Sequence, residues 1–270
     1  MLVISEINIY PIKSLRGISL HSSNVTDRGL EYDRRWMLVD HKGNFMTQRE
    51  YPQMALINVE IKDDGLSVYH RKKNLSPLFI PFKIKTVQKA VVPIWDDTCS
   101  VILLGNEFDN WFTEALDINC FLVYQPDETK RFVDEKYSKN KELVSLADAY
   151  PFLIIGQSSL DDLNSRLEIH LPMNRFRPNI VFSGGKPFEE DDIKEFKIGS
   201  VFFYAVKPCS RCVITTTNQE TAERLDEPLK TLAAYRKFNN KVLFGMNLIH
   251  KGSGKINVGD CIEIIEHVGT

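Results

Sequence analysis

The chain has 270 residues, with 34 Lys and Arg against 36 Asp and Glu, which gives a formal net charge of −2. Hydrophobic residues make up 43% and charged residues 26%, the balance of a globular protein with a substantial core. This length indicates one large domain or two closely packed ones. A charge so close to zero excludes a general attraction to nucleic acid or anionic membranes, so any anion site must be built from local groups.

The sequence also bears on the compartment. No apolar run approaches the roughly 18 residues that a membrane-spanning helix needs. Residues 1–14 alternate in polarity and are typical of a first strand rather than of a secretion signal. Five cysteines, scattered apart from one close pair, argue against a disulfide framework and for a reducing compartment. We therefore expect a cytoplasmic protein with no membrane or nucleic-acid partner.

Residues 1–125 are predicted to be rich in β-strands. Short runs of β-branched and aromatic residues, separated by turn residues, favour this class. The predicted strands are Val3–Tyr10, Trp36–Asp40, Ala55–Ile61, Leu66–His70, Leu78–Lys83, Lys89–Pro93, Cys99–Leu103 and Cys120–Tyr124. One stretch, Asn106–Ala115, has a more helical pattern.

The composition changes at Gln125–Asn140, which is polar, charged and almost free of aliphatic residues. Such a segment is typical of a linker or of a mobile loop across a site. We place a domain boundary there, with an N-terminal β-rich domain over residues 1–125 and a second domain over residues 126–270.

Residues 126–270 combine predicted strands with short helices. The predicted strands are Pro151–Ile155, Asn179–Ser183, Ser200–Lys207, Leu243–His250 and Cys261–Glu266. A helix is predicted over Ser158–Leu167, with a serine at its N-cap and leucines on one face, and another over Glu227–Phe238. Many short strands with few helices predict a mainly β fold, a barrel or sandwich that carries short helices.

Cys209-Ser-Arg-Cys212 needs an explanation, because two thiols three residues apart could bind zinc, form a redox disulfide or supply one reactive thiolate. A structural zinc ion needs four ligands, and the six histidines supply no second pair. A redox motif should open a helix, yet the β-branched run Val213–Thr217 resists one. A further possibility is that the two thiols are half-buried and have no functional role. The neighbouring Lys207 and Arg211 favour a thiolate, the form that binds soft metals.

Several basic residues lie within apolar sequence, where burial is expected. They are Lys13, Arg34, Arg35, Arg49, Arg175 and Arg177. A buried cation needs a partner, which is either a local carboxylate such as Asp33 or Glu50 or an external anion. Ser14 and Ser158-Ser159 add hydroxyl and backbone N–H donors suited to phosphate. Together these residues predict a site for a phosphorylated anion near a thiolate.

These segments resemble the MOSC-domain proteins, named for the C-terminal domain of molybdenum cofactor sulfurases, that carry an N-terminal β-barrel. The resemblance is strongest to the amidoxime reducing components and their bacterial relatives. The similar segments run in order along nearly the whole chain. They are Tyr10–Ser14, Gly29–Trp36, Phe45–Arg49, Val92–Asp96, Ala147–Pro151, Ser159–Asn164, Arg175–Asn179, Pro208–Thr216, Glu227–Leu232 and Leu243–Asn247.

The resemblance implies a fold and a cofactor. The fold would be an N-terminal MOSC-type β-barrel domain packed on a MOSC β-barrel domain, divided at residue 125. The cofactor would be molybdenum-molybdopterin, with Cys212 as the metal ligand and catalytic residue. The residues that would hold the cofactor are Lys13, Ser14, Arg34, Ser158, Ser159, Arg177, Ser210 and Asn247.

The resemblance also implies an activity. Relatives that are enzymes reduce N-hydroxylated compounds such as hydroxylamines, amidoximes and N-hydroxylated bases. Electrons would come from a separate iron–sulfur, haem or flavin protein, because the sequence carries no cysteine-rich extension. A cofactor carrier or maturation protein without turnover, and a zinc or dithiol binding module, are the alternatives. Two positions depart from the family pattern: Ile193 stands where relatives often have Trp, and Asn247 where the animal enzymes have Tyr.

Overall fold

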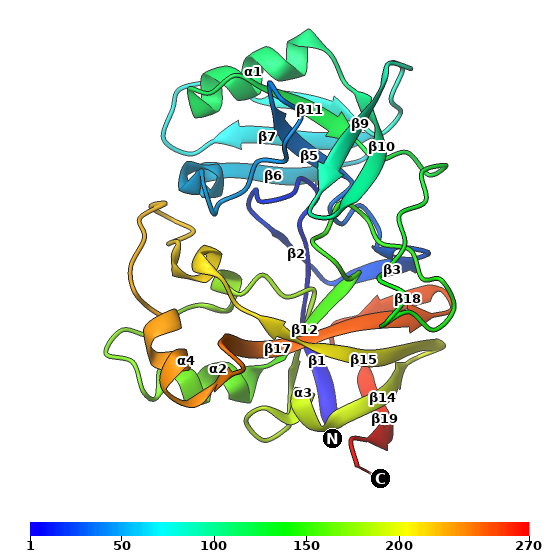
Figure 1. Cartoon of the computed structure of the whole chain (residues 1–270), viewed down its shortest axis with the longest axis vertical. Helices are drawn as coiled ribbons and strands as arrows, with labels where there is room; N and C mark the ends of the chain where they lie inside the picture. Colours follow the sequence, from blue (N-terminus) through cyan, green and yellow to red (C-terminus); the bar gives the residue numbers. More distant parts are fainter. Residues whose placement is uncertain (270) are drawn as a thin grey trace.

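The computed structural model describes residues 1–269, and its largest element is a closed β-barrel (Figure 1). Its seven strands, in spatial order, are β12 (Phe152–Gly156), β13 (Ile180–Ser183), β1 (Leu2–Ile9), β19 (Cys261–His267), β14 (Ile193–Ile198), β15 (Val201–Ser210) and β17 (Lys241–Lys251). Antiparallel pairing of β12 with β17 closes the ring, while β12 and β13 run parallel. The predicted mainly β fold with a barrel is confirmed.

Side chains fill the interior of this barrel. Phe152, Phe196 and Phe203 are each at most 1% exposed. The ring of Phe203 lies 5.2 Å from each of the other two ring centroids. Where β17 approaches β12, Gly245 has a φ of +80°, and a Cβ there would lie 2.7 Å from Cγ1 of Ile155. Because a small barrel holds only core side chains, polar functional groups must lie at its ends or rim.

The first strand, β1, pairs with strands from the C-terminal half of the chain. Strand β1 pairs with β13 and with β19, both of which follow residue 150. The next strands continue this arrangement: β2 (Ile18–Leu20) pairs with β1, and β3 (Ser22–Thr26) pairs with β4 (Gly29–Leu30) and with β18 (Gly254–Asn257). The strand pairing therefore crosses the boundary placed at residue 125, because the start of the chain lies on the barrel.

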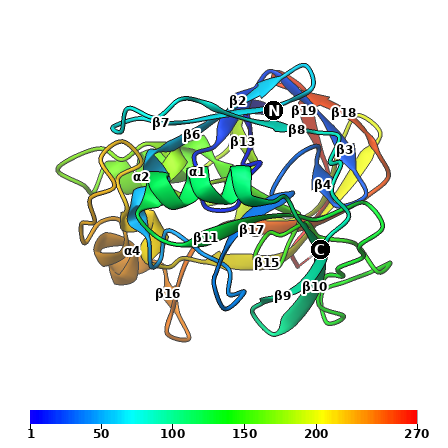
Figure 2. The same cartoon turned by 90° about the horizontal axis from the view of Figure 1, so that it is seen from above.

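The remaining N-terminal residues form a second part, stacked on the barrel along the long axis (Figure 1). One of its sheets consists of β5 (Trp36–Asp40), β11 (Cys120–Tyr124), β10 (Asp97–Leu103) and β9 (Lys89–Ile94). The other consists of β6 (Ile57–Lys62), β7 (Gly65–His70) and β8 (Leu78–Pro81), preceded by the 3-10 turn η1 (Pro52–Leu56). Helix α1 (Asn106–Leu116) lies across this part and buries Phe112 against the shared core (Figure 2).

The polar segment Gln125–Asn140 is anchored by its own side chains and neighbours. Arg131 is 5% exposed and donates hydrogen bonds to the carbonyl oxygens of Ser145, Ala147 and Asp148 at 2.6–2.9 Å. Its Nε also lies 3.0 Å from a carboxylate oxygen of Asp97 in β10. Residues 147–150, which follow the segment, reach the cavity described below, but none of residues 125–140 lines it, so the choice between a linker and a loop across a site stays a prediction.

Short helices surround the barrel. They are α2 (Gln157–Asn164), η2 (Met173–Arg175), α3 (Glu189–Asp192), η3 (Val213–Thr216) and α4 (Leu229–Tyr235). The prediction that Val213–Thr217 resists a helix was wrong for one short turn, because the Thr215 and Thr216 hydroxyls donate back to carbonyls three residues earlier at 3.0 and 2.8 Å.

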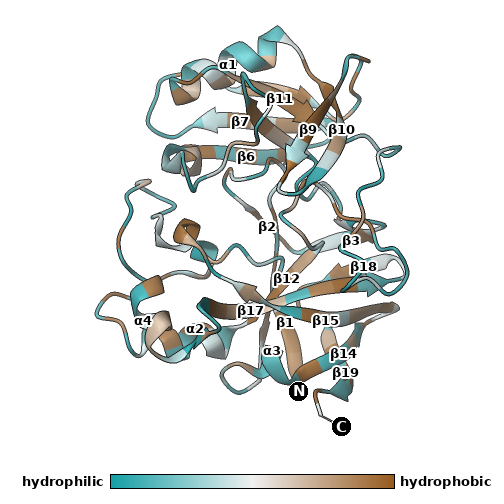
Figure 3. Ribbon diagram, in the orientation of Figure 1, coloured by the Kyte–Doolittle hydropathy of each residue, from teal (hydrophilic) through white to brown (hydrophobic). Residues whose placement is uncertain are grey.

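Hydrophobic residues concentrate on the strands and hydrophilic ones on the outer loops (Figure 3). Within residues 1–269, no helix is long and apolar enough to cross a membrane.

A buried carboxylic acid accepts a hydrogen bond from the first turn of α2. The Ser159 hydroxyl donates to Oε2 of Glu190 at 2.8 Å, and both side chains are buried. The other Glu190 oxygen has no hydrogen-bond partner among residues 1–269. Burial raises the pKa of Glu190 from its ordinary value of 4.5 to about 7. The folded protein therefore holds a proton that the unfolded chain has released between these two pH values, and stability falls as pH rises through that window.

We predict that Glu190→Gln removes this loss of stability. An amide keeps an oxygen that can accept from Ser159 but carries no charge to bury. At pH 8 the variant should be more stable than the parent chain by about 1–3 kcal/mol, while at pH 5 the two should be nearly equal. Urea unfolding at both values measures this, with Glu168→Gln at an exposed position as the control. An unchanged dependence of stability on pH in Glu190→Gln would contradict the assignment.

Candidate functional site

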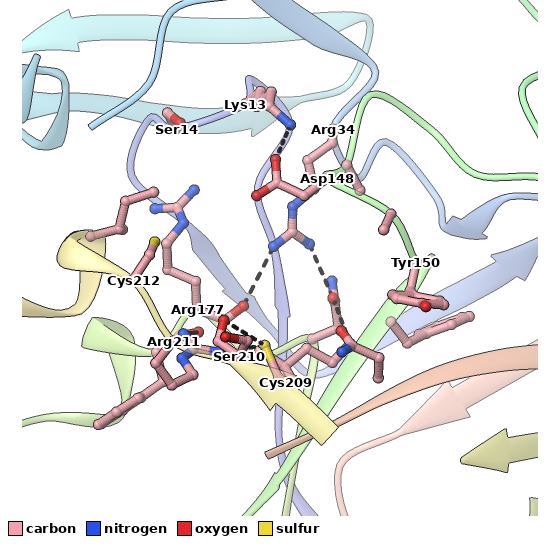
Figure 4. Close-up of a pocket in the computed structure, with 18 of the residues that line it drawn as sticks. Lys13, Ser14, Arg34, Asp148, Tyr150, Arg177, Cys209, Ser210, Arg211 and Cys212 are labelled. Atoms are coloured by element: carbon pink, nitrogen blue, oxygen red, sulfur yellow. Dashed lines mark hydrogen bonds and ion pairs between the residues drawn. The ribbon is translucent and has the colours of Figure 1, made fainter. Parts of the chain in front are cut away.

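A cavity of about 160 Å³ lies where the two parts of the molecule meet (Figure 4). The N-terminal side contributes Lys13, Ser14, Arg34 and Arg49. The barrel side contributes, among others, Phe176, Arg177, Asn179, Cys209, Ser210, Arg211, Cys212 and Asn247. Residues 147–150, which follow the polar segment, form a third wall. Residues from both sides of the composition change therefore share one cavity.

Three of the lining residues have strained backbone. Ser14, Arg34 and Arg177 have φ values of 66°, 49° and 57°, in the left-handed region that favours glycine. Such residues cost about 1–3 kcal/mol each and persist where the surrounding structure holds them, often at functional sites. All three belong to the short loops that follow β1, precede β5 and precede β13. The backbone thus aims these side chains at the cavity at an energetic cost.

The cavity has a strong excess of positive charge. Its basic side chains are Lys13, Arg34, Arg49, Arg177 and Arg211, and its one lining carboxylate, among the described residues, is Asp148. The chain as a whole has a net charge of −2. The cations are therefore concentrated here, as the sequence predicts for a locally built anion site.

Lys13 and Arg49 share the Asp148 carboxylate. Nζ of Lys13 lies 2.6 Å from one oxygen and NH2 of Arg49 lies 2.8 Å from the other. Burial lowers the pKa of Lys13 to about 8, against the opposing effect of Asp148. Desolvation would raise the pKa of Asp148, but Lys13 and Arg49 hold it well below its usual value. The Asp148 carboxylate thus links the Lys13 ammonium to a second cation, the Arg49 guanidinium.

Arg34 is fully engaged with the protein. Its NH1 lies 2.6 Å from the buried Asp33 carboxylate and 3.0 Å from Oδ1 of Asn179. Its NH2 lies 3.4 Å from the backbone oxygen of Arg177. The sequence left two kinds of partner open for a buried guanidinium group, a local carboxylate or an external anion. Arg34 has the first kind. Arg34 therefore orders both walls of the cavity, whatever else it binds.

Arg177 has no such partner. Within residues 1–269, its guanidinium makes no hydrogen bond or ion pair, and its one contact of note is with the Tyr10 ring, 4.2 Å from the centroid. Burial lowers the pKa of Arg177 to about 10, so the group stays charged at neutral pH. A desolvated cation without a counter-ion is unfavourable unless a ligand supplies one. Arg177 is therefore the strongest indication of an external anion.

The two cysteines have different surroundings. Cys209, near the end of β15, has its sulfur 2.9 Å from NH1 of Arg211, whose NH2 also donates to the Phe176 carbonyl. Cys212 is exposed and precedes η3. Among residues 1–269 there is no group of three or more His, Cys, Asp and Glu that could hold a metal ion. The pair thus lacks the further protein ligands of a structural zinc site, and Cys212 is the accessible thiol.

The polar residues divide between the cavity and the core. Ser14, Ser210 and Asn247 line the cavity, and the Asn247 amide donates to the Lys207 carbonyl at 3.0 Å. The other two predicted serines do not line it. Ser158 donates to the Gly185 carbonyl at 2.6 Å, and Ser159 to Glu190. Their donors support the start of α2 instead of facing the cavity.

Some lining residues were not among the predicted site residues. Arg49 belonged to the set of basic residues in apolar sequence, which was its only signal. Asp148 and Tyr150 lie in a segment that carries the resemblance, but nothing in the sequence indicates that Asp148 pairs with a lysine 135 residues earlier. Ile193, one of the two positions that depart from the family pattern, is 2% exposed in the barrel core and does not line the cavity.

Comparisons with known proteins agree with this architecture. The chain matches the MOSC N-terminal beta barrel domain over residues 1–119 and the MOSC domain over residues 141–263. It is 34% identical to mitochondrial amidoxime reducing component 2 of Rattus norvegicus, over 95% of this chain and 81% of that protein. It is 32% identical to mitochondrial amidoxime-reducing component 1 of Homo sapiens, over 97% of this chain and 82% of that one.

A longer relative matches over the same region. Molybdenum cofactor sulfurase of Solanum lycopersicum is 30% identical over 98% of this chain, which corresponds to 35% of that protein. The family models together account for most of the chain, and the identities extend over nearly all of it. The chain therefore belongs to the family of MOSC-domain proteins with an N-terminal β-barrel domain, and amidoxime reducing components are among its relatives.

Proposed function

We propose that this protein holds a molybdenum cofactor in the cavity between its two parts and reduces N-hydroxylated compounds there. One observation carries the proposal: the unpartnered guanidinium of Arg177 and the exposed thiol of Cys212 line the same cavity. A molybdopterin-type cofactor has a phosphate at one end and a thiolate-binding metal at the other. The names of relatives that match nearly the whole chain, amidoxime reducing components, support the reaction class.

The residues present fit such a group. Cys212 would bind the metal, because a thiolate is a preferred ligand of soft metals. Arg177 and Lys13 would bind the phosphate through charge-assisted hydrogen bonds, and the hydroxyls of Ser14 and Ser210 would add neutral donors. Arg34 and Asn247 would fix the walls, since both are bonded to the protein. Ser158 and Ser159 would act at a distance, through the start of α2.

The reaction consumes two electrons and two protons for each N–O bond broken. The oxygen of the substrate leaves as water, and the nitrogen compound leaves without its hydroxyl. When bound, the cofactor supplies two-electron redox chemistry, and a separate iron–sulfur, haem or flavin protein supplies the electrons. The protein would orient the bound group: Cys212 would hold one end of it and the cationic walls the other. Protons come from solvent, which reaches the exposed Cys212.

A second candidate function is a carrier that binds the cofactor without turnover. The match to a molybdenum cofactor sulfurase over 98% of this chain favours keeping it. The test is the reduction of hydroxylamine by cofactor-loaded protein with an artificial electron donor. Turnover that depends on bound molybdenum supports the reductase. Tight molybdenum binding without turnover supports the carrier.

Cys212→Ser should abolish molybdenum-dependent activity and leave the fold intact, whereas Cys209→Ser should lose only part of it. A hydroxyl binds a soft metal far more weakly than a thiolate, and Cys209 is directed to Arg211. Metal content, circular dichroism and hydroxylamine turnover of both variants measure this. If both variants lost all metal and all activity equally, a site formed by two cysteines would replace the assignment.

Arg177→Lys should weaken cofactor retention, and Arg177→Ala should weaken it further, by roughly ten- to a hundredfold, because a charged hydrogen bond contributes about 1.5–3 kcal/mol. Lysine keeps the charge but loses the fork of donors. Cofactor release during dialysis measures retention. The unfolding temperature of the cofactor-free protein should change little, because Arg177 has no protein partner to lose among residues 1–269.

Arg34→Lys is the matched control. Arg34 is paired with a buried carboxylate and an amide oxygen, so this change should destabilise even the cofactor-free protein by about 1–3 kcal/mol. If Arg177 variants instead unfold as early as Arg34→Lys without cofactor, Arg177 is a structural residue and the anion site fails.

A further inference from the structure

A second hollow lies on the outer face of β1. It has a volume of about 290 Å³. We call it the outer hollow, and it is lined by Glu6, Asn8, Tyr10, Arg16, Gly17, Ser19, Pro172, Met173, Asn174, Arg177 and Gln219. Among the residues that the structure describes, Arg177 alone lines both the outer hollow and the cofactor cavity. The cation that lacks a protein partner can therefore be reached by a ligand from two sides.

The alternation of β1 explains which side chains line the outer hollow. Ile7 and Ile9 belong to the barrel core. Because successive side chains of a strand point to opposite faces, Glu6, Asn8 and Tyr10 point outward. Polar groups on an outer strand face are usually open to solvent, yet Asn8 is only 8% exposed and Tyr10 only 3%. The segments β2 and η2 therefore cover this face and enclose a polar site.

A relay of hydrogen bonds orients the Glu6 carboxylate in the outer hollow. The Ser19 hydroxyl donates to Oδ1 of Asn8 at 2.6 Å, and Nδ2 of Asn8 donates to Oε2 of Glu6 at 3.1 Å. Ser19 lies opposite Asn8 in the pairing of β2 with β1. Within residues 1–269, no Lys, Arg or His side chain forms an ion pair with Glu6. The protein thus orients one carboxylate oxygen and leaves the other to accept from a ligand.

The two guanidinium groups of the outer hollow differ in their partners. Arg16 is neutralised, because its NH2 lies 2.5 Å from the Glu220 carboxylate and its NH1 donates to the Gln219 carbonyl at 3.2 Å. Arg177 forms no ion pair or hydrogen bond with the described part of the chain, Glu6 included. The outer hollow therefore presents one cation and one carboxylate that are unpaired and do not pair with each other.

We propose that the outer hollow binds a free α-amino acid, whose carboxylate pairs with Arg177 and whose ammonium group pairs with Glu6. A ligand with a single charge would leave one of these two groups without a partner, whereas a zwitterion satisfies both. The Tyr10 ring and the buried Met173 side chain supply apolar surface for the side chain of the ligand.

The shared guanidinium links the outer hollow to the cofactor cavity. In the proposed function Arg177 binds the phosphate of the cofactor, so the amino acid and the cofactor both require the same side chain. Occupation of one site weakens the other, and linkage makes the effect equal in both directions. The amino acid is thus an effector that lowers cofactor retention. This coupling rests on the proposed function, but the amino-acid site itself does not.

The first test uses the full chain without cofactor and needs no variant. Calorimetric titration with each of the twenty free amino acids should find at least one that binds saturably. Its analogue without the amino group and its analogue without the carboxyl group should each bind at least about tenfold more weakly, because each loses charge-assisted hydrogen bonds. For alanine, these analogues are propionate and ethylamine.

The second test removes the charge of Glu6. Glu6→Gln keeps an oxygen that can accept from Asn8, so the fold should be intact while amino-acid binding falls roughly tenfold or more. Ser19→Ala, which breaks the relay, should weaken binding by a smaller factor. Glu168→Gln, at an exposed position outside the outer hollow, is the control and should bind the amino acid like the parent chain.

The third test measures the coupling in the cofactor-loaded protein. The amino acid that binds in the first test, added at a concentration that saturates the cofactor-free chain, should speed cofactor release during dialysis. The same concentration should have little effect on cofactor release from Glu6→Gln, because that variant binds the amino acid weakly. Its analogue without the amino group should also have little effect.

The outcomes separate this site from the proposed function. Saturable binding that is lost in Glu6→Gln supports the amino-acid site even if the chain binds no molybdenum, in which case the proposed function alone fails. The site is overturned if no amino acid binds, if the analogues with one charge bind as tightly as the amino acid, or if Glu6→Gln binds like the parent chain. Equally tight binding with and without cofactor overturns the coupling through Arg177.

Discussion

The site depends on one aromatic ring with two guanidinium groups beside it. Arg34 and Arg177 lie 4.3 and 4.2 Å from the centroid of Tyr10, which immediately follows β1. Burial raises the pKa of Tyr10 to about 12, so the ring stays neutral and cannot act as a counter-ion. Only Arg34 has a carboxylate, the buried Asp33, which also accepts the Tyr10 backbone N–H at 2.8 Å. Arg177 is therefore held against the Tyr10 ring without a carboxylate to neutralise its charge.

The position of the cavity follows from the path of the first strand. Because β1 lies in the barrel, the loop after it leaves the barrel and carries Lys13 and Ser14 into the N-terminal part. The seam that results is tied by a reciprocal pair of buried amides, Gln48 and Gln219, at 2.9 and 3.2 Å. The same Gln48 amide donates to the Ser14 carbonyl at 2.8 Å. Gln219, which follows Cys212, is thus linked through Gln48 to the loop that carries Lys13.

Local patterns predicted most of the long strands, the main helices and most of the cationic cavity, because alternation and embedded charge are properties of short segments. They missed the barrel strand β14 and the short strands β3 and β18. They did not distinguish donors that serve the fold from donors free for a ligand. Ser159 and Ser14 look alike in sequence, yet one faces a buried Glu190 that lies 31 residues later. Likewise, the pairing of β1 with the C-terminal strands rests on contacts between distant residues. Such long-range partners are set by topology, which no local window of sequence contains.

Asp148 separates two environments of opposite charge. Its carboxylate pairs with Lys13 and Arg49 on the side of the cavity, and its backbone carbonyl accepts from Arg131, which in turn pairs with Asp97. The cations of the cofactor cavity therefore lie on one side of Asp148, and a hollow lined by Asp96, Asp97, Asp134 and Glu135 lies on the other. An anionic cofactor in the cavity would be held by the cations on its side of Asp148 and repelled by the carboxylates on the other.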